Sequence, residues 1–341
     1  MTLLFKTAIM LPMKKWLHIP CVITLCVGML SACTKGKPNL SADVNIAVLK
    51  GPSSIGMIKL MDETDSGDAA AKTFSFEIFA SADEIVPKIV QGKIDIAAVP
   101  PNLSSVLYNN TQGKVQVIAI GTLGMMYIVE NGNSIASIED LRGKKLSAGF
   151  RGKSPEYDLH YILNANGIET EKDLTIEWKS EHTESVAALA ANTISIAVLP
   201  QPFATTALML HENINIALDL NREWEKIQEK SGRASALVTG VLVARTEFIA
   251  QNPGTVAEFL DRYAASVEFA HTNRGETAAL VEHYGIFPAA VAEKAIPYCN
   301  ITFIEGQEMK DKLSDYLQIL FEQNPQSVGG ALPNDAFYFI R

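Results

Sequence analysis

The chain has 341 residues, of which 38 are acidic and 29 are basic, so its net charge at pH 7 is −9 with neutral histidines. This acidic balance argues against nucleic acid or an anionic membrane face as a partner, because both attract basic surfaces. The length is sufficient for two domains of ordinary size, each with its own hydrophobic core.

The first 33 residues are typical of a secretory signal that ends in a lipoprotein box. They contain three basic residues and no acidic one, then the apolar run Ile19–Leu30, and then the motif Leu-Ser-Ala-Cys that ends at Cys33. The apolar run is too short to span the ~30 Å hydrocarbon core of a membrane. We therefore expect lipid attachment at Cys33, with either Met1 or Met13 as the true start.

Removal of this signal changes both the charge and the cysteine content. The net charge of the remaining chain becomes −12, since three basic residues leave. Two of the four cysteines lie inside the signal and Cys33 carries the lipid, so Cys299 is the one free thiol and a disulfide within the chain is excluded. An isolated cysteine is more often a buried apolar side chain than a nucleophile.

One segment of the sequence occurs twice, since Gly92–Leu103 returns as Asn192–Phe203. Each copy has a β-branched apolar run that ends in prolines, which predicts a strand buried on both faces. The similarity continues toward the N-terminus, where residues 50–53, 74–78 and 82–91 match residues 151–154, 174–178 and 182–191. We infer two similar lobes of the β-α-β kind.

Strands and helices are expected to alternate along the chain. Strands are predicted at residues 44–49, 74–79, 94–99, 115–129, 145–150, 174–178, 194–199 and 234–245. Helices are predicted up to Met61, from about Ala82, after Asn102, from Ser154 to about Gly167, at 182–191, after Phe203, and repeatedly from Pro253 onward. This alternation with parallel crossovers predicts the α/β class.

Two long strands interrupted by glycine are suited to carry the chain from one lobe to the other. We place the first crossing near residues 121–127 and the second near residues 236–244, and two crossings make a hinge. The predicted organisation is a signal at 1–33, a flexible tether at 34–42, lobe I at 43–122 and 246–341, and lobe II at 123–245.

A ligand of such a fold is expected beyond the carboxyl ends of the strands, where helix N-termini face a crevice. Lobe I then supplies Gly51, Pro52, Ser53, Ser54, Ser81, Pro101, Asn102 and Thr122, and lobe II supplies Arg151, Gly152, Ser154, Glu181, His182, Gln201 and Phe203. Hydroxyls and backbone amides would hold polar atoms, an arginine suits an anionic group, and an aromatic side chain can stack on a ring. The alternative for the serines and Asn102 is that they only cap helices.

The sequence offers no catalytic or metal-binding motif. Residues 149–154 imitate the end of a phosphate-binding loop, but that loop requires glycine where Ser147 stands. The histidines are scattered, and there is no HExxH, CxxC, GxSxG or glycine-rich dinucleotide motif. We therefore predict no catalytic residue, no metal and no cofactor.

Several segments together carry a resemblance to a known family. The lipoprotein box and residues 49–56, 95–100, 177–182 and 297–300 resemble the substrate-binding lipoproteins of ABC importers. The branch is the one that includes binders of nitrate, sulfonate, taurine and thiamine-pyrimidine precursors. The resemblance implies a type II periplasmic-binding-protein fold that closes around one small organic anion or heteroaromatic molecule.

The resemblance also implies a place and partners for the protein. It would be a monomer outside the cytoplasm, in the periplasm or on the outer face of the cell membrane, held there by its lipid. It would deliver its ligand to an ABC permease with a cytoplasmic ATPase. Two alternatives stay open, a pyrimidine-synthase-like enzyme and a ligand-sensing receptor ectodomain, although that enzyme's cysteine-rich segment is missing here.

Overall fold

A computed structural model describes residues 43–67, 73–233 and 235–341. The predicted signal, its Cys33 and the predicted tether lie outside the described residues. Among the residues that are described, no helix is long and apolar enough to cross a membrane.

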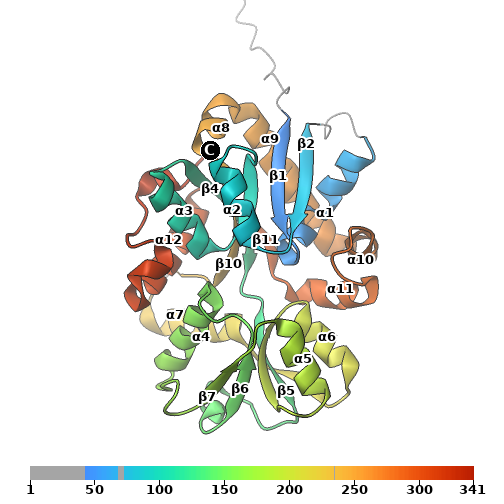
Figure 1. The fold of residues 1–341 in the computed structure, drawn as a ribbon, viewed down its shortest axis with the longest axis vertical. Helices are drawn as coiled ribbons and strands as arrows, with labels where there is room; N and C mark the ends of the chain where they lie inside the picture. The colour runs from blue at the N-terminus through green and yellow to red at the C-terminus, as the bar shows by residue number, and fades with distance from the viewer. Residues whose placement is uncertain (1–42, 68–72, 234) are drawn as a thin grey trace, which may run out of the picture. The chain divides into compact units, whose positions relative to one another are not determined.

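Two mixed β-sheets organise the described chain (Figure 1). The six-stranded sheet has the order β11 (Ile301–Ile304), β4 (Val115–Leu123), β10 (Val238–Arg245), β3 (Ile96–Val99), β1 (Val44–Leu49) and β2 (Phe74–Phe79). The five-stranded sheet has the order β7 (Thr175–Trp178), β6 (Lys145–Ala148), β8 (Ile196–Pro200), β5 (Met126–Asn131) and β9 (Ile214–Asp219). We call these sheets, with the helices that follow, lobe I and lobe II. The predicted two-lobe α/β fold is confirmed.

The helices divide between the lobes. Lobe I has α1 (Pro52–Asp65), α2 (Ala82–Val90), α3 (Pro101–Thr111), α8 (Thr246–Gln251), α9 (Pro253–Thr272), α10 (Arg274–His283), α11 (Ala289–Ala295) and α12 (Gly306–Gln323). Lobe II has α4 (Ser154–Ala165), α5 (His182–Ala190), α6 (Phe203–Leu210) and α7 (Leu220–Ser231). Short 3₁₀ turns lie at Ile138–Leu141, Ile296–Tyr298, Pro325–Val328 and Asp335–Phe337.

The sequence repeat appears in the strand order. In lobe I, β2, β1 and β3 are parallel and β10 is antiparallel to β3, while in lobe II β7, β6 and β8 are parallel and β5 is antiparallel to β8. Each antiparallel strand is the first strand after the chain has crossed from the other lobe. The same local pattern therefore builds the same half-sheet twice, because short buried strands linked by helices pair in parallel.

The chain passes between the sheets twice, and the second crossing differs in position from the expectation. β4 ends at Leu123 and β5 begins at Met126, so the first passage is at Gly124 and Met125. β10 pairs with β4 from Val238 to Arg245 and with β3 from Val241 to Ala244, so the chain has already returned to lobe I by Val238. Residues 238–245 therefore lie in the lobe I sheet and not in lobe II. An apolar strand pattern predicts that a strand is buried, but it does not predict which sheet the strand joins.

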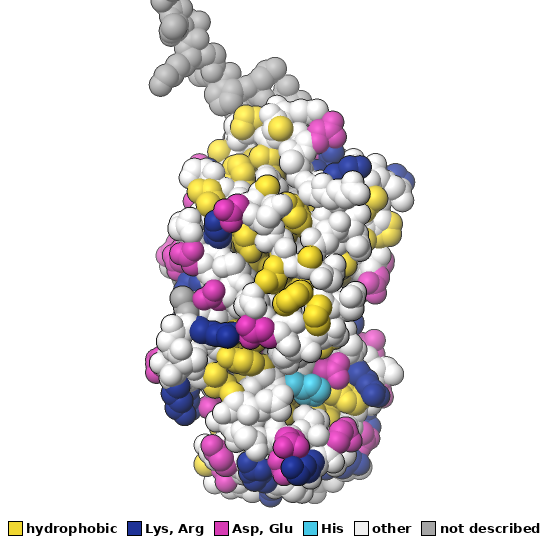
Figure 2. All heavy atoms as spheres, turned by 90° about the vertical axis from the view of Figure 1, so that its left-hand side faces the viewer, with side chains coloured by type: hydrophobic (Ala, Val, Ile, Leu, Met, Phe, Trp, Pro, Cys, Tyr) yellow, Lys and Arg dark blue, Asp and Glu magenta, His cyan; other side chains and the backbone are white. Residues whose placement is uncertain are grey.

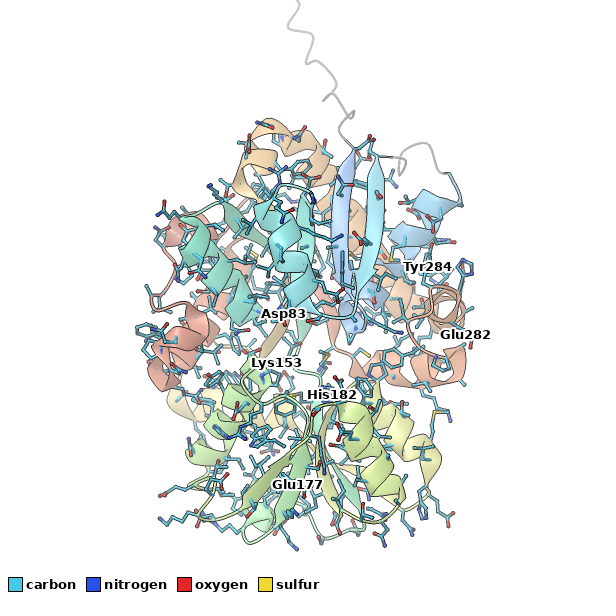
Figure 3. All side chains as sticks on the ribbon, in the orientation of Figure 1. Asp83, Lys153, Glu177, His182, Glu282 and Tyr284 are labelled. Atoms are coloured by element: carbon cyan, nitrogen blue, oxygen red, sulfur yellow. The ribbon has the colours of Figure 1, made fainter. Side chains whose placement is uncertain are left out.

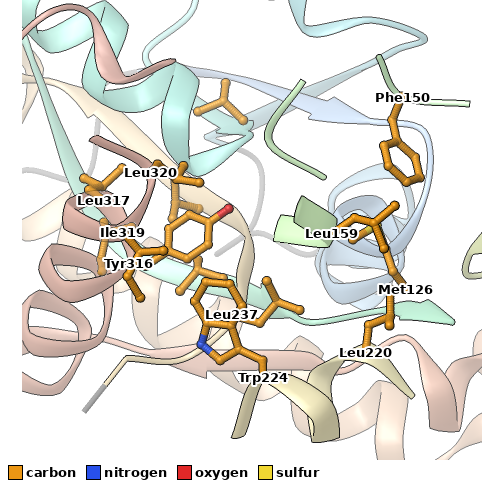
Figure 4. Close-up of a cluster of buried hydrophobic side chains, with 14 of the residues drawn as sticks. Met126, Phe150, Leu159, Leu220, Trp224, Leu237, Tyr316, Leu317, Ile319 and Leu320 are labelled. Atoms are coloured by element: carbon orange, nitrogen blue, oxygen red, sulfur yellow. The ribbon is translucent and has the colours of Figure 1, made fainter. Parts of the chain in front are cut away.

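Helix α12 connects the hydrophobic cores of the two lobes. Its Tyr316 and Leu317 belong to one buried cluster with Leu220 and Trp224 of lobe II (Figure 4). The ring centroids of Trp224 and Tyr316 are 5.7 Å apart, within the range of favourable aromatic pairs. The helices after Pro253 contact elements of lobe I, and the last long one also contacts α4 of lobe II.

A buried polar contact lies inside this junction. The Tyr316 hydroxyl donates a hydrogen bond of 2.9 Å to Oδ1 of Asp158 on α4, and both residues are buried. Oδ2 of Asp158 has no hydrogen-bond partner among the described residues. Burial raises the pKa of the Asp158 carboxyl well above its usual range, so the neutral form is favoured.

We predict that Tyr316→Phe lowers the free energy of unfolding by about 1–3 kcal/mol, because the buried Asp158 carboxyl loses the hydroxyl that contacts it. Urea unfolding followed by circular dichroism measures the change. Tyr338→Phe is the matched control, since the Tyr338 ring is also buried but its hydroxyl makes no hydrogen bond among the described residues. Equal stability of the two variants would contradict the importance of this contact.

Candidate functional site

The loops that follow the parallel strands of lobe I and lobe II lie where the two lobes meet. Figure 3 places Asp83, two residues into α2, on the lobe I side of this region. It places Lys153 and His182, at the starts of α4 and α5, on the lobe II side, whereas Glu177 of β7 lies deeper in lobe II. Both lobes therefore present helix N-termini at this junction, which is where α/β sheets bind ligands.

Four ring side chains form a continuous series across the junction, and we call them the aromatic row. The His182 ring centroid is 6.0 Å from that of Phe150 and 5.2 Å from that of Phe203. Phe203 in turn lies 5.7 Å from Phe287, which belongs to the lobe I segment between α10 and α11. The first three rings come from the strand ends of lobe II, so the aromatic row joins the two lobes.

His182 is a neutral side chain in this row. Burial, with a smaller contribution from the charge of Lys153, lowers the pKa of the imidazole to about 4. Nδ1 is buried and has no hydrogen-bond partner among the described residues. A Cβ added at Gly149 would lie 2.9 Å from this nitrogen, so glycine is needed there for the imidazole to pack against the backbone after β6.

Gln201 provides the second buried polar group of the site. Its side chain is 2% exposed, and its Oε1 accepts hydrogen bonds from the backbone N–H of Thr205 at 3.2 Å and from the Thr205 hydroxyl at 2.8 Å. Its Nε2 has no partner among the described residues. A buried donor without a partner costs about 1–3 kcal/mol, so it marks a position where a partner from outside the chain would be favourable.

Several predicted lobe I residues are occupied with their own helix ends. The Ser54 hydroxyl donates to the carbonyl of Gly51 and accepts from its N–H, and the Ser53 hydroxyl donates to the carbonyl of Leu49. Pro52 is buried at the start of α1. Ser81 caps α2 through the N–H of Asp83. For these serines the structure shows the capping contacts that the sequence left as an alternative.

The other predicted lobe I residues are tied to neighbouring segments. Pro101 is buried at the start of α3, and the Asn102 side chain donates to the carbonyl of Ser327 at 3.3 Å. Thr122 is buried at the end of β4 and accepts a hydrogen bond of 3.1 Å from the Thr239 hydroxyl of β10. These contacts stabilise lobe I close to the crossings.

The predicted lobe II residues before α4 and α5 differ from one another in exposure. Arg151 is exposed, and it makes no hydrogen bond or ion pair among the described residues. Gly152 is also exposed, and its N–H donates to Oε2 of Glu156. Ser154 is buried, and the N–H of Glu181 donates to Oε1 of Glu184 at the start of α5. The structure thus brings together the rings of His182 and Phe203, while Arg151 stays exposed.

The sequence did not single out Phe150 and Phe287 as site residues. Phe150 follows β6, so its place at a strand end could have suggested it, and its ring also contacts Trp178 at 5.8 Å. Phe287 follows an ordinary helix, and nothing local indicates that it faces lobe II. Only the packing of α11 against α6 brings it there.

Two hollows of the described surface are lined by residues outside the aromatic row. A groove of about 1010 Å³ lies between the end of α6 and the α11 region, where Met209, Leu210 and Tyr298 are exposed. A pocket of about 520 Å³ lies at the other end of lobe II, beside Glu130 and Lys144. On the face in Figure 2, acidic and basic side chains are interspersed over the lower lobe, and hydrophobic side chains gather higher up. No cluster of three or more metal-ligating side chains occurs among the described residues.

The comparisons with known proteins agree with this architecture. The sequence matches the family of periplasmic substrate-binding proteins of phosphonate ABC transporters over residues 67–231, which include every element of lobe II. This part of the chain is similar to the periplasmic substrate-binding proteins of ABC transporters. No curated protein matches the chain. The family is one of non-catalytic binding proteins, as the absence of catalytic motifs predicts.

Solved structures of such binding proteins share the type II fold of this chain. An ABC transporter protein from Parabacteroides distasonis has a TM-score of 0.72 at 22% identity, with 86% of this chain and 98% of that chain covered. The periplasmic aliphatic sulphonate binding protein of Escherichia coli has a TM-score of 0.67 at 16% identity, with 85% and 92% covered. The periplasmic nitrate-binding protein of Synechocystis has a TM-score of 0.57 at 15% identity, with 83% and 81% covered.

We predict that His182→Phe reduces the loss of stability on acidification. The unfolded chain binds a proton at this histidine below about pH 6.5, but the folded protein does so only near pH 4, so a falling pH favours unfolding across this window. The contribution is up to about 3 kcal/mol, and phenylalanine keeps a ring in the aromatic row. Urea unfolding of the wild type and the variant at pH 7 and pH 4 measures the difference.

His160 has a pKa lowered chiefly by burial and acts in the same direction, so the variant should keep part of the pH dependence. If His182→Phe and the wild type lose the same stability between pH 7 and pH 4, the neutral buried imidazole is not the group responsible.

Proposed function

We propose that this substrate-binding component of an ABC importer captures one small molecule between lobe I and lobe II and closes around it by hinge bending. The observation that carries the proposal is the aromatic row, because Phe203, at a strand end of lobe II, contacts Phe287 of lobe I. The hinge would act at the crossings, at residues 124–125 and at residues 232–233 and 235–237. Closure would enclose the ligand and present a new surface to the permease.

The ligand would be a small organic anion or a heteroaromatic molecule. His182, Gln201 and Phe203 would contact it directly, with Arg151 at the edge. The other strand-end residues of both lobes remain candidates through their backbone groups. Two structurally similar proteins are a sulphonate-binding and a nitrate-binding protein, which supports an anion, whereas the aromatic row supports a ring.

The protein would also be held at the outer side of a membrane by lipid on Cys33. The sequence of the first 33 residues is the support for this anchor, since its basic start, short apolar run and Leu-Ser-Ala-Cys motif agree with one another. Residues 34–42 would act as the tether, and the monomer would deliver its ligand to a permease with a cytoplasmic ATPase.

We predict that one chemical class of small molecule stabilises the purified protein after copurified ligand has been removed by unfolding and refolding. A ligand at a hundred times its dissociation constant should add about 2.7 kcal/mol, which is a shift of a few degrees in thermal unfolding. The panel contains sulfonates, phosphonates, nitrate, amino acids and heteroaromatic bases. The same ligand should lower the radius of gyration in X-ray scattering, because the lobes approach each other.

Binding without any change in the radius of gyration would argue against hinge closure. A folded protein that responds to no member of the panel would argue against capture of a small solute.

We predict that Cys33→Ala abolishes incorporation of radioactive fatty acid into the protein in growing cells, because the thiol that accepts the lipid is missing. Cys299→Ala is the matched control and should label like the wild type, since Cys299 is buried inside lobe I. Continued labelling of the Cys33→Ala protein would refute the lipid anchor.

A further inference from the structure

Hydrogen bonds divide the first crossing between the lobes at a single residue. The carbonyl of Gly124 accepts a hydrogen bond from Nδ2 of Asn300, which directly precedes β11 of lobe I. The carbonyl of the next residue, Met125, accepts from the backbone N–H of Gln201, which directly follows β8 of lobe II. The peptide bond between them is rigid, so only φ and ψ of Met125 separate the two carbonyls. A rotation about these torsions turns one lobe against the other without breaking either bond.

Asn300 holds the lobe I side of this crossing through its backbone as well. Its carbonyl accepts from the N–H of Leu123 at 3.0 Å, so one residue binds two successive residues of the crossing. The carbonyl of Leu123 accepts from the Thr239 hydroxyl of β10 at 2.6 Å. The backbone up to Gly124 is therefore tied to β10 and to the segment before β11, and it moves with lobe I.

The glycine of the crossing is tightly packed. A Cβ added at Gly124 would lie 2.6 Å from Oδ1 of Asn221, at the start of α7, and 2.8 Å from Cδ2 of Leu237. Glycine is therefore required here because other segments approach the backbone closely. Although glycine is the residue with the widest choice of torsions, the contacts hold Gly124 and leave the rotation to Met125.

The conformation of Asn300 suits its double role. Its φ is +44°, in the left-handed region that non-glycine residues seldom occupy, although asparagine tolerates it better than most. Backbone conformations of this kind are held by surrounding contacts and are frequent at functional positions. Here the carbonyl is directed to Leu123 and the side chain to Gly124.

A further contact from the same segment joins the lobes beyond Met125. The Tyr127 hydroxyl of β5 donates a hydrogen bond of 2.8 Å to the carbonyl of Tyr298, and the Tyr127 side chain is buried. This bond connects lobe II directly to the turn before β11, so a large rotation at Met125 must break it. It therefore favours the angle between the lobes that is observed here.

We propose that Met125 is the pivot of the first crossing, that Asn300 fixes the lobe I side of this pivot, and that the Tyr127 hydroxyl holds the resting angle between the lobes. This inference rests on the proposed function, because it assigns a position and a restraint to the hinge bending. Asn300 and Tyr127 are positioning residues in this proposal, since they act on the movement of the lobes.

The test measures the distance between the lobes in refolded protein that is free of copurified ligand. Nitroxide labels on Val90→Cys of α2 and on Lys172→Cys, between α4 and β7, report this distance by double electron–electron resonance. Both positions are exposed, at 60% for Val90 and 69% for the Lys172 side chain. The labels are introduced in the Cys33→Ala background, where the buried Cys299 does not compete for them.

Two variants remove the restraints on the pivot. Asn300→Gly keeps the left-handed conformation but removes the donor to Gly124, so bending is no longer confined to Met125. Tyr127→Phe keeps the ring but removes the hydroxyl that binds the carbonyl of Tyr298. Each variant should raise the population outside the main distance peak about fivefold, as expected for the loss of one hydrogen bond.

A third variant addresses the pivot itself. Met125→Gly gives the pivot more accessible torsions, so it should broaden the same distance distribution. Asn192→Gly is the matched control, because Asn192 is an exposed asparagine of lobe II with a φ of +54° and lies away from the crossings. It should leave the distribution unchanged. Circular dichroism establishes that each variant is folded.

The opposite results separate this inference from the proposed function. A distribution like that of the wild type in both Asn300→Gly and Tyr127→Phe overturns the restraint, and the same result in Met125→Gly overturns the pivot. If methanesulfonate, nitrate or another member of the ligand panel then still shortens the wild-type distance, hinge closure stands with its pivot elsewhere. If neither the variants nor any member of the panel changes the distance, both the inference and the proposed hinge closure fail.

Discussion

Parallel pairing of β1, β2 and β3 in lobe I, and of β6, β7 and β8 in lobe II, is the constraint on which the site depends. Parallel strands need a helix between them, so every carboxyl end of a strand leads into a helix N-terminus at the same edge of its sheet. Two chain crossings turn these edges toward each other. The junction is therefore lined by loops and helix starts, while the hydrophobic cores cover the faces of the sheets.

Hydrogen bonds within each lobe determine which of these loops have polar atoms without a partner. In lobe I the hydroxyls of Ser53, Ser54 and Ser81 are engaged with the ends of their own helices, so they stabilise the turns rather than face outward. In lobe II the buried Nε2 of Gln201 and Nδ1 of His182 have no partner among the described residues. The two lobes share a strand topology, but they differ in the polar groups that lack a partner. The specificity of the proposed site would therefore lie mostly in lobe II.

The two sides of the junction differ in the way the lobes touch. On the α12 side, Tyr316 and Trp224 are fully buried in a core cluster that continues from one lobe to the other. On the α6 side, Phe203 and Phe287 are only partly buried and meet edge to face. A large buried apolar contact resists separation because its exposure to water is unfavourable. Movement of one lobe relative to the other would therefore occur mainly at the partly buried aromatic row, close to the groups that would hold a ligand.

The sequence by itself determined the repeated half-sheet, since the match between Gly92–Leu103 and Asn192–Phe203 reflects local patterns of period, proline and burial that act through near neighbours. It also placed His182, Gln201 and Phe203 at strand ends, because that position follows from the chain order. Only the tertiary structure decided that β10 joins the lobe I sheet, that the Asn102 side chain is engaged with the carbonyl of Ser327, and that Phe287 completes the aromatic row. These outcomes depend on which surfaces distant segments bury against each other, and no local pattern records that choice.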